Sequence, residues 1–231
     1  MWSSETNRRT APRKLDQVNR GSILTSGGGS ILASVEERGS SGIDIGKHER
    51  KLGISASDTR TLGFTDTPVP KASRLGAEGE GLKIALTQLD HGRIGVALQA
   101  LGIGEAALAE SRKYAKERQQ FGKPIAEFQA IAFKLADMRV KLDASRLLIG
   151  HALNKMAGGE RFTTEAAEAK LFSSETANWV ANEAVQIHGG YGYMKEYPVE
   201  RYFRDARITE IYEGTSEAQR IVISRAVLSE S

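Results

Sequence analysis

Three long stretches of helical periodicity lie between residues 81 and 190, and they constrain the fold more than any other feature of the sequence. In each stretch apolar residues recur at intervals of three and four, which is the spacing of one face of an amphipathic helix. The stretches begin after Gly81, after Pro124 and near Thr163, and glycine pairs at 158–159 and 189–190 end the second and third. Three such helices with short connections favour an antiparallel bundle.

The apolar positions of these stretches are the predicted core. In the first two stretches they are Leu82, Leu86, Leu89, Ile94, Ala97, Leu98, Leu101, Leu108, Ile131, Leu135, Met138, Leu142 and Ile149. Two shorter helices are predicted around residues 198–205 and from Ser216 to Val227. The fold class that follows is mainly α, an antiparallel helical bundle with a small amino-terminal β remnant.

The residues before the helical part are patterned differently. Residues 1–42 combine a Gly-Gly-Gly run with weak apolar periodicity, which predicts poor order or a rearranged piece of a β-domain. Between residues 53 and 70, β-branched and apolar residues alternate with turn-forming residues and predict a strand or two. The expected domains are therefore residues 1–42, a partial β-domain over 43–76 and the helical bundle over 77–231.

Composition excludes several classes of protein. No run of eighteen apolar residues is present, so the sequence predicts no membrane-spanning helix. The 231 residues contain no cysteine, which excludes disulfides, thiol nucleophiles and cysteine-ligated metals. The formal charge of +3 arises in the first twenty residues, which hold five Lys/Arg against two Asp/Glu. The basic excess is thus a property of this tail, and no nucleic-acid partner is expected.

The segment Ile211-Tyr-Glu-Gly-Thr-Ser-Glu-Ala-Gln219 is the most informative for chemistry. Glu213 precedes a glycine and a helix start, at which Ser216 and Gln219 have the spacing of a capping box. Gly214 would allow a ligand to approach the carboxylate, and the free N–H groups of the helix start would attract anionic oxygens. From the spacing alone, an ordinary acid favoured by the helix dipole is the simpler interpretation.

Two glycines follow a helical stretch at Gln186-Ile-His-Gly-Gly190. Their N–H groups suit phosphate contacts, and a plain helix C-cap explains them as well. His188 has no second metal ligand at a suitable spacing beside it, so we predict no metal site.

Arginines mark two more segments. In Glu117-Arg-Gln-Gln-Phe-Gly122, the guanidinium of Arg118 could bind two oxygens of a pyrophosphate, or could be a solvated arginine at a helix C-terminus. The segment Asp90-His-Gly-Arg93 interrupts an apolar stripe with polar groups. It suits either a ligand site or a buried Asp–Arg pair that holds two helices together.

These segments, in this order and at these separations, resemble the acyl-CoA dehydrogenase family, and most closely its short-chain, butyryl-type members. The resemblance runs from about Gly53 to Leu228. It also includes Lys51-Leu-Gly53, Asp58-Thr-Arg-Thr-Leu-Gly-Phe64, Phe128-Gln-Ala130 and Arg204-Asp-Ala-Arg207. By this resemblance residues 43–76 look like the end of the family's middle β-domain, and residues 77–231 look like its carboxy-terminal helical domain.

The resemblance implies an FAD-dependent α,β-desaturation of a short-chain acyl-CoA to the trans-2-enoyl-CoA, in fatty acid or branched-chain acid breakdown. Glu213 would remove the α-proton of the thioester, while FAD accepts hydride from the β-carbon. Some relatives carry the base at the position of Gly92, where a glycine cannot serve, which leaves Glu213 as the candidate. The residues that the resemblance assigns to the acyl-CoA pocket are Asp90, His91, Gly92, Arg93 and Gly214.

The resemblance also implies a cofactor and partners. The residues that it assigns to FAD are Arg118, Phe121, Gln129, Gln186, Ile187, His188, Gly189, Gly190, Thr215, Ser216 and Glu217. Those from Arg118 to Gly190 would reach the FAD of a neighbouring subunit. A homo-oligomer, dimer or tetramer, and an electron-transfer flavoprotein as the acceptor follow from the same resemblance. We expect a cytoplasmic protein in a bacterium, or a protein of the mitochondrial matrix in a eukaryote.

Full-length members of the family begin with a helical domain and a complete β-domain, whereas some fifty residues precede the match at Lys51. A truncated chain is therefore the expectation. The alternative to an active dehydrogenase is a non-catalytic helical subunit or fragment that retains only the oligomer interface. An intact Glu213 favours the enzyme, because a chain without catalysis has no need of that acid.

Overall fold

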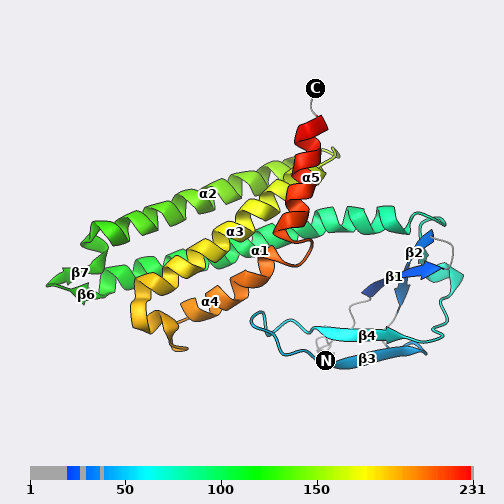
Figure 1. The fold of residues 1–231 in the computed structure, drawn as a ribbon, viewed down its shortest axis with the longest axis horizontal. Helices are drawn as coiled ribbons and strands as arrows, with labels where there is room; N and C mark the ends of the chain where they lie inside the picture. Colours follow the sequence, from blue (N-terminus) through cyan, green and yellow to red (C-terminus); the bar gives the residue numbers. More distant parts are fainter. Residues whose placement is uncertain (1–19, 27–29, 37–38, 230–231) are drawn as a thin grey trace, which may run out of the picture. The chain divides into compact units, whose positions relative to one another are not determined.

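The computed structural model describes residues 20–26, 30–36 and 39–229, and the chain divides into two compact units. One unit comprises Met1–Lys47 and Arg60–Ala85, and the other comprises His48–Thr59 and Leu86–Ser231. Figure 1 labels the helices α1 to α5 and the strands β1 to β4, β6 and β7. The three domain boundaries expected from the sequence remain a prediction.

The first unit is built from short strands. β1 (Arg20–Ser26), β2 (Ser30–Glu36) and β5 (Arg74–Leu75) form an antiparallel sheet in the order β1-β2-β5. β3 (Ile43–His48) and β4 (Arg60–Phe64) form a two-stranded sheet, and the 3₁₀ turn η1 (Lys71–Ser73) precedes β5. β4 is the strand expected between residues 53 and 70. β1 and β2 lie in the stretch predicted to be poorly ordered or a rearranged β-domain piece, of which residues 1–19, 27–29 and 37–38 are outside the described part.

The second unit is a helical bundle, which confirms the predicted fold class. Its helices are α1 (Gly81–Glu117), whose first turn belongs to the other unit, α2 (Gln129–Ala157), α3 (Thr163–His188), α4 (Val199–Ala206) and α5 (Ser216–Ser229). The connections contain β6 (Gln119–Gln120), β7 (Lys123–Pro124), η2 (Ile125–Glu127), η3 (Gly189–Tyr193) and η4 (Arg207–Glu210). Helices α1, α2 and α3 lie side by side and form the body of the bundle (Figure 1).

The links between helices follow from local conformation. Phe121 and Gly122, between β6 and β7, both have positive φ (52° and 79°), as the central residues of a type I′ hairpin turn require. This hairpin reverses the chain between α1 and α2. Gly159 (φ 72°) and Gly189 (φ 59°) follow the ends of α2 and α3, where glycine accepts a left-handed conformation at little cost.

The core lies between the three long helices and is rich in alanine on α1. One cluster contains Leu108, Met138, Leu142 and Val180, and a second contains Ile94, Ala97, Ile149 and Ala166. The short alanine side chains let the helices approach closely. Most of the predicted core positions are therefore confirmed.

Three predicted core residues are wrong: Leu82, Leu86 and Leu98 are 51%, 51% and 46% exposed. Leu98 lies about 100° around the helix from the fully buried Ala97, outside the face that packs. Leu82 and Leu86 precede Ile94, the first α1 residue of the core clusters. Since α1 has 37 residues and α2 and α3 have 29 and 26, one end of α1 extends beyond its helical partners.

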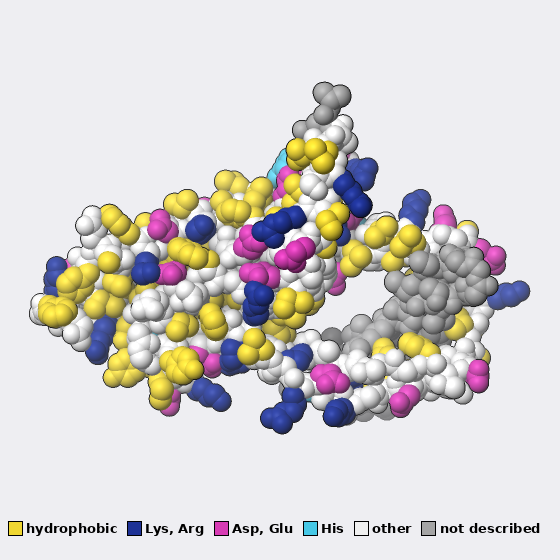
Figure 2. Space-filling model, viewed as in Figure 1, with side chains coloured by type: hydrophobic (Ala, Val, Ile, Leu, Met, Phe, Trp, Pro, Cys, Tyr) yellow, Lys and Arg dark blue, Asp and Glu magenta, His cyan; other side chains and the backbone are white. Residues whose placement is uncertain are grey.

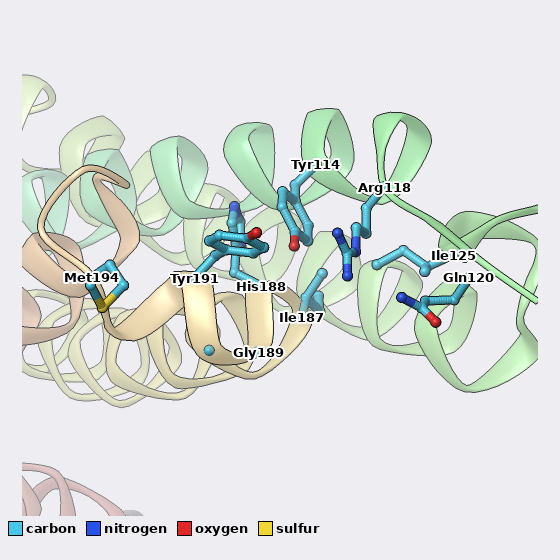
Figure 3. Close-up of a pocket in the computed structure, with 10 residues that line it drawn as sticks. Tyr114, Arg118, Gln120, Ile125, Ile187, His188, Gly189, Tyr191 and Met194 are labelled. Carbon is cyan, nitrogen blue, oxygen red and sulfur yellow. The ribbon is translucent and has the colours of Figure 1, made fainter.

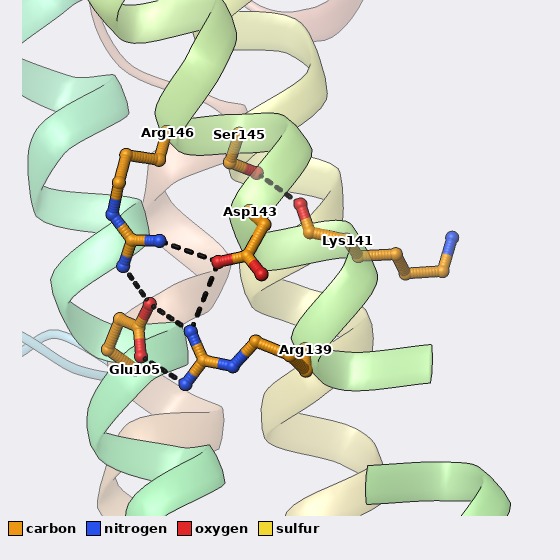
Figure 4. Close-up of polar contacts among 6 residues, drawn as sticks. All are labelled: Glu105, Arg139, Lys141, Asp143, Ser145 and Arg146. Carbon is orange, nitrogen blue, oxygen red and sulfur yellow. Dashed lines mark hydrogen bonds and ion pairs between the residues drawn. The ribbon is translucent and has the colours of Figure 1, made fainter. Parts of the chain in front are cut away.

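A charged network joins α1 to α2 on the bundle surface (Figure 4). Arg139 donates to both carboxylate oxygens of Glu105 at 3.2 Å and also contacts Asp143, while Arg146 contacts Glu105 and Asp143. The two arginines hold the pKa of Asp143 below its ordinary value through their hydrogen bonds. Because the side chains of Arg139, Arg146 and Asp143 are about half exposed, the network contributes little to the stability of the fold.

The segment His48–Thr59 packs on the end of α4. The guanidinium of Arg204 donates to the Leu52 carbonyl at 3.0 Å, and the Ile54 amide donates to the Asp205 carboxylate at 2.5 Å. A β-carbon at Gly53 would lie 2.6 Å from the Arg204 carbonyl oxygen, so only glycine fits there. Two of the sequence segments that carried the resemblance, around residues 51–53 and 204–207, are therefore one structural contact.

Gly192 lies in η3, just after α3, at a position where packing leaves no room for a side chain. A β-carbon at this position would lie 2.5 Å from the carbonyl oxygen of Val185 and 2.9 Å from the β-carbon of His188, and the backbone cannot yield. We expect Gly192→Ala to lower the free energy of unfolding by about 3 kcal/mol, as overpacking does. Urea unfolding measures the loss. Gly190→Ala is the control, because no atom lies within 4 Å of the added carbon; equal effects of both substitutions would contradict the steric explanation.

Candidate active site

Glu213 lies in a left-handed turn directly before α5. Glu213 has φ 54° and Gly214 has φ 92°, and the positive value at a glutamate is an uncommon, strained conformation. Tyr212 anchors the turn to α1 by donating its hydroxyl to the side-chain oxygen of Gln99. On the other side of the glutamate, the Gly214 carbonyl accepts hydrogen bonds from Lys170 and Gln219. The turn is therefore held on both sides of Glu213.

The helix cap at α5 differs from the predicted capping box. The helix begins at Ser216, and its N-cap is Thr215, whose hydroxyl accepts a hydrogen bond from the Ala218 amide at 3.3 Å. The Ser216 hydroxyl is buried without a hydrogen-bond partner in the described part of the chain. The predicted pairing of Ser216 with Gln219 is wrong, because the Gln219 amide donates instead to the Gly214 carbonyl at 2.9 Å.

The carboxylate of Glu213 lies against the backbone of α1 at Gly92. A β-carbon on Gly92 would be 2.5 Å from Oε2 and 2.9 Å from Cδ of Glu213, so the missing side chain of Gly92 provides the space for the carboxylate. Within the described residues, no hydrogen bond or ion pair occupies the Glu213 carboxylate. The structure thus brings together two residues that the family resemblance links as alternative positions of the base, and it leaves both carboxylate oxygens available.

Asp90 and Arg93 form a partly buried ion pair, in agreement with one of the two interpretations of their segment. Arg93 donates to Asp90 at 2.9 Å, and the hydroxyl of Thr163 at the start of α3 donates to the second Asp90 oxygen at 2.7 Å. The pair therefore joins α1 to α3. Arg93 is 8% exposed and its Nε atom has no partner among the described residues. His91 is exposed and donates to the Thr87 carbonyl at 2.9 Å.

Lys170 is a member of this site that the sequence analysis missed. It lies on α3 with no exposed surface, and its ammonium donates to the Gly214 carbonyl at 2.6 Å. Its neighbours Ala166, Ala167 and Ser174 on the same helix are also buried. Its signal in the sequence is weak: Lys170 stands at helical spacing among small residues, and this pattern alone does not distinguish it from a lysine on the exposed face of an amphipathic helix.

Burial lowers the pKa of Lys170 from its ordinary value of 10.5 to about 8. The charge of Arg93 lowers it in the same direction. The carboxylates that act in the opposite direction are Glu210, Glu213 and Glu217. The ammonium therefore lies among three acids and one arginine, contributed by α1, η4, the turn and α5.

We expect the stability contributed by Lys170 to depend on pH. Below pH 8 the ammonium is charged in the folded and the unfolded chain, and its burial opposes folding. Between about pH 8 and 10.5 the folded chain releases this proton while the unfolded chain keeps it, so stability rises with pH by up to about 3 kcal/mol. Urea unfolding of the wild type and Lys170→Met across this range measures the effect. The difference in the free energy of unfolding between the wild type and Lys170→Met should change with pH. A constant difference would contradict the prediction.

A second group of predicted residues lines a cleft of about 540 Å³ at the other end of α3 (Figure 3). Arg118 comes from the chain just after α1, and Ile187 to Gly190 come from the end of α3 and the start of η3. The remaining lining residues are Tyr114, Gln120, Ile125, Tyr191 and Met194. The guanidinium of Arg118 lies 5.7 Å from the ring centre of Tyr191, so it is oriented across an aromatic face.

His188 forms the aromatic wall of this cleft. Its ring stacks on Tyr114 with centroids 4.3 Å apart, and its Nδ1 atom donates to the Ala184 carbonyl at 2.8 Å. Burial lowers the pKa of His188 below its ordinary value, while the hydrogen bond acts in the opposite direction. A neutral ring with its proton on Nδ1 leaves Nε2 as an acceptor.

The other predicted cofactor residues do not line this cleft. Gln129 and Gln186 are exposed, at the start of α2 and near the end of α3. Phe121 is 91% exposed at the tip of the β6–β7 hairpin. Thr215 caps α5, and Ser216 and Glu217 lie in its first turn, close to Glu213 in the chain. The predicted residues therefore fall into a group around Glu213, a group around Arg118 and His188, and exposed residues near the second group.

The described residues contain no cluster of three or more histidines and acids that could hold a metal ion. None of the helices in the described part is long and apolar enough to cross a membrane.

The chain is similar to known proteins in sequence and in fold. The sequence profile described as "Acyl-CoA dehydrogenase, C-terminal domain" matches residues 79–228. The chain belongs to the acyl-CoA dehydrogenase family. It is 53% identical over 202 residues to the short-chain-specific acyl-CoA dehydrogenase of Megasphaera elsdenii, an alignment that covers 87% of this chain and 53% of that protein.

Solved structures of acyl-CoA dehydrogenases have the same fold. The butyryl-CoA dehydrogenase of Megasphaera elsdenii superposes with a TM-score of 0.87 at 51% identity, over 90% of this chain and 55% of that one. An acyl-CoA dehydrogenase of Bacillus anthracis, solved in complex with FAD, superposes with a TM-score of 0.80 at 36% identity, over 86% and 37%. The chain spans about half the length of the curated relatives that it matches.

Proposed function

We propose that this chain acts as an FAD-dependent acyl-CoA dehydrogenase that desaturates a short-chain acyl-CoA, with Glu213 as the base that removes the α-proton. The observation that carries the proposal is the Glu213 carboxylate, placed against Gly92 with no partner among the described residues. Similarity to short-chain-specific and butyryl-CoA dehydrogenases supports the substrate class.

The surroundings of Glu213 suit proton abstraction from carbon. An α-proton of a thioester is weakly acidic, so a carboxylate removes it only where water is excluded and the enolate oxygen is stabilised. An acyl chain beside Gly92 would displace water from Glu213 and make the carboxylate a stronger base. The absence of a side chain at Gly92 leaves the room that the carboxylate occupies, and we assign both Gly92 and Gly214 to this pocket. Asp90, His91 and Arg93 would form the polar end of the same pocket.

The residues present fit a flavin cofactor. Ser216 Oγ and Gln219 Oε1 are buried without partners in the described part of the chain, in the first turn of a fourteen-residue helix. Free N–H groups at such a helix start attract phosphate oxygens. We assign Thr215, Ser216 and Glu217 to one FAD, which when bound would accept the hydride from the β-carbon. Arg118 and the cleft at residues 187–190, with the exposed Phe121, Gln129 and Gln186, are assigned to the FAD of a neighbouring subunit.

Exposed apolar residues support a homo-oligomer, dimer or tetramer. Phe133, Val140 and Leu147 are 57%, 68% and 76% exposed, and their seven-residue spacing places them on one face of α2. Figure 2 shows hydrophobic side chains exposed between charged ones on the helical unit. An apolar stripe of this kind is typical of a surface that packs against another subunit. The proposal extends, by family membership, to an electron-transfer flavoprotein as the acceptor and to a bacterial cytoplasm or a mitochondrial matrix.

The test is the visible spectrum of the purified chain after incubation with FAD and gel filtration. We expect retained flavin absorbance that bleaches when butyryl-CoA is added without oxygen. Hexanoyl-CoA and longer esters would be added in the same way to define the preferred chain length. An oligomeric chain that retains no flavin, or whose flavin does not bleach with any acyl-CoA, would support the alternative of a non-catalytic helical subunit.

A further inference from the structure

The Glu213–Gly214 turn is under strain and receives unusual support. A glutamate with positive φ is held only where surrounding contacts impose the conformation. The Gly214 carbonyl accepts two hydrogen bonds, from the Lys170 ammonium at 2.6 Å and from the Gln219 amide at 2.9 Å. The same amide lies 3.3 Å from the Glu213 carbonyl. Both donors are fully buried side chains, so their geometry is fixed by packing.

Lys170 is a costly choice for a purely structural support. A buried ammonium loses its hydration, and an apolar side chain of similar size is often as stable or more stable in such a position. Gln219 already supplies a neutral donor to the same carbonyl. What the lysine adds is a positive charge near the Glu213 carboxylate, together with a short, charge-assisted hydrogen bond to the backbone of the turn.

We propose that Lys170 is the positioning residue of Glu213: its ammonium binds the Gly214 carbonyl, maintains the left-handed turn and so keeps the Glu213 carboxylate against Gly92. The inference rests on the proposed function, in which Glu213 is the base. Lys170 touches neither the acyl-CoA nor the reacting atoms in this proposal. Its effect is transmitted through the backbone of Gly214 and through its charge.

The charged groups that face Lys170 come from four elements. Arg93 on α1 opposes the ammonium, and Glu210, Glu213 and Glu217 favour it. Because burial lowers the pKa of Lys170 to about 8, the ammonium is present at neutral pH and is lost at moderately alkaline pH. The position of Glu213 should therefore respond to pH in the range where Lys170 titrates.

The contact between Glu213 and Gly92 can be measured without cofactor or turnover. In the full chain labelled in glutamate and glycine, a nuclear Overhauser cross-peak is expected between the Gly92 α-protons and the Glu213 γ-protons. We expect Lys170→Met to keep the far-UV spectrum and the melting temperature of a folded chain and to lose this cross-peak. A folded Lys170→Met chain that retains the cross-peak at wild-type intensity would overturn the proposal.

Lys155→Met is the matched control. Lys155 on α2 pairs with Glu165 on α3, so its removal changes the net charge equally and also breaks a contact between helices. We expect the cross-peak to persist in this variant. Its loss in Lys155→Met as well as in Lys170→Met would overturn the specific role of Lys170.

The wild type provides a second measurement if Lys170→Met does not fold. Raising the pH above 8 should move the carbonyl-carbon resonance of Gly214 with a midpoint near the pKa of Lys170, about 8, and should weaken the cross-peak. A Gly214 resonance and a cross-peak that do not change through this range would overturn the proposal.

Turnover separates this inference from the function on which it rests. In the flavin-loaded protein we expect Lys170→Met to lower kcat by about 10- to 100-fold with KM near the wild-type value, as misplacement of a catalytic group does. Normal turnover by Glu213→Gln would overturn the assignment of the base itself. A wild-type kcat for Lys170→Met beside an inactive Glu213→Gln would overturn the positioning role alone.

Discussion

Glu213→Gln should reduce the rate of flavin bleaching by butyryl-CoA by at least about 1,000-fold, because the amide cannot accept the α-proton and a general base contributes up to about 10,000-fold. Glutamine has nearly the same shape as glutamate, and within the described residues no hydrogen bond or ion pair to the Glu213 carboxylate would be lost. We therefore expect the fold and the binding of acyl-CoA to persist. Stopped-flow absorbance of the flavin measures the rate, and a substrate titration measures the binding.

Glu196→Gln is the control for this substitution. Glu196 is exposed in the segment before α4, so its replacement makes the same change of charge away from the site. Its bleaching rate should equal that of the wild type. If Glu213→Gln bleached as fast as the control, Glu213 would not be the base, and the carboxylate beside Gly92 would need another role.

Gly92→Ala should lower the bleaching rate by about 100-fold, the cost of moving a catalytic group by roughly 1 Å. The added β-carbon would lie 2.5 Å from Oε2 of Glu213, so the carboxylate has to move away. The stability should hardly change, since the obstructing atoms are the end of a flexible side chain and alanine favours a helix over glycine by up to about 1 kcal/mol. Thermal unfolding and stopped-flow bleaching of the same preparation separate the two effects.

Gly95→Ala is the matched control on the same helix. No atom lies within 4 Å of its added β-carbon, so it has the same helix-stabilising effect without contact to Glu213. We expect a wild-type bleaching rate. Equal rates for Gly92→Ala and Gly95→Ala would show that the Glu213 carboxylate does not lie against Gly92 during the reaction.

The helical part of the fold could be predicted from the sequence because its signals are local. Stripes of apolar residues at intervals of three and four, and glycines at 158–159 and 189–190, are each contained within a few turns of chain. The expected helices agree with α2 and α3. The exposed Leu82, Leu86 and Leu98 could not be predicted, since burial depends on which neighbouring helix reaches a given turn.

Part of the candidate site could also be predicted. Glu213 and Gly92 were selected from separate segments, and the structure places them in contact. The role of Asp90 and Arg93 was left between a ligand site and an ion pair. The structure shows the ion pair, joined to Thr163, and the place of these residues in the acyl-CoA pocket stays a proposal. Lys170 was missed because its segment resembles an ordinary amphipathic helix until the carbonyl that it contacts, 44 residues away, is known.

The sequence alone determined which residues form helices, which carboxylate precedes a helix start and which family the chain resembles, because periodicity, turn residues and short motifs are properties of neighbouring positions. Only the tertiary structure decided that α1 presents the backbone of Gly92 to Glu213, and that α3 directs a buried ammonium to the Gly214 carbonyl. Contacts of this kind depend on how helices distant in sequence pack together. No pattern within a single segment specifies that packing.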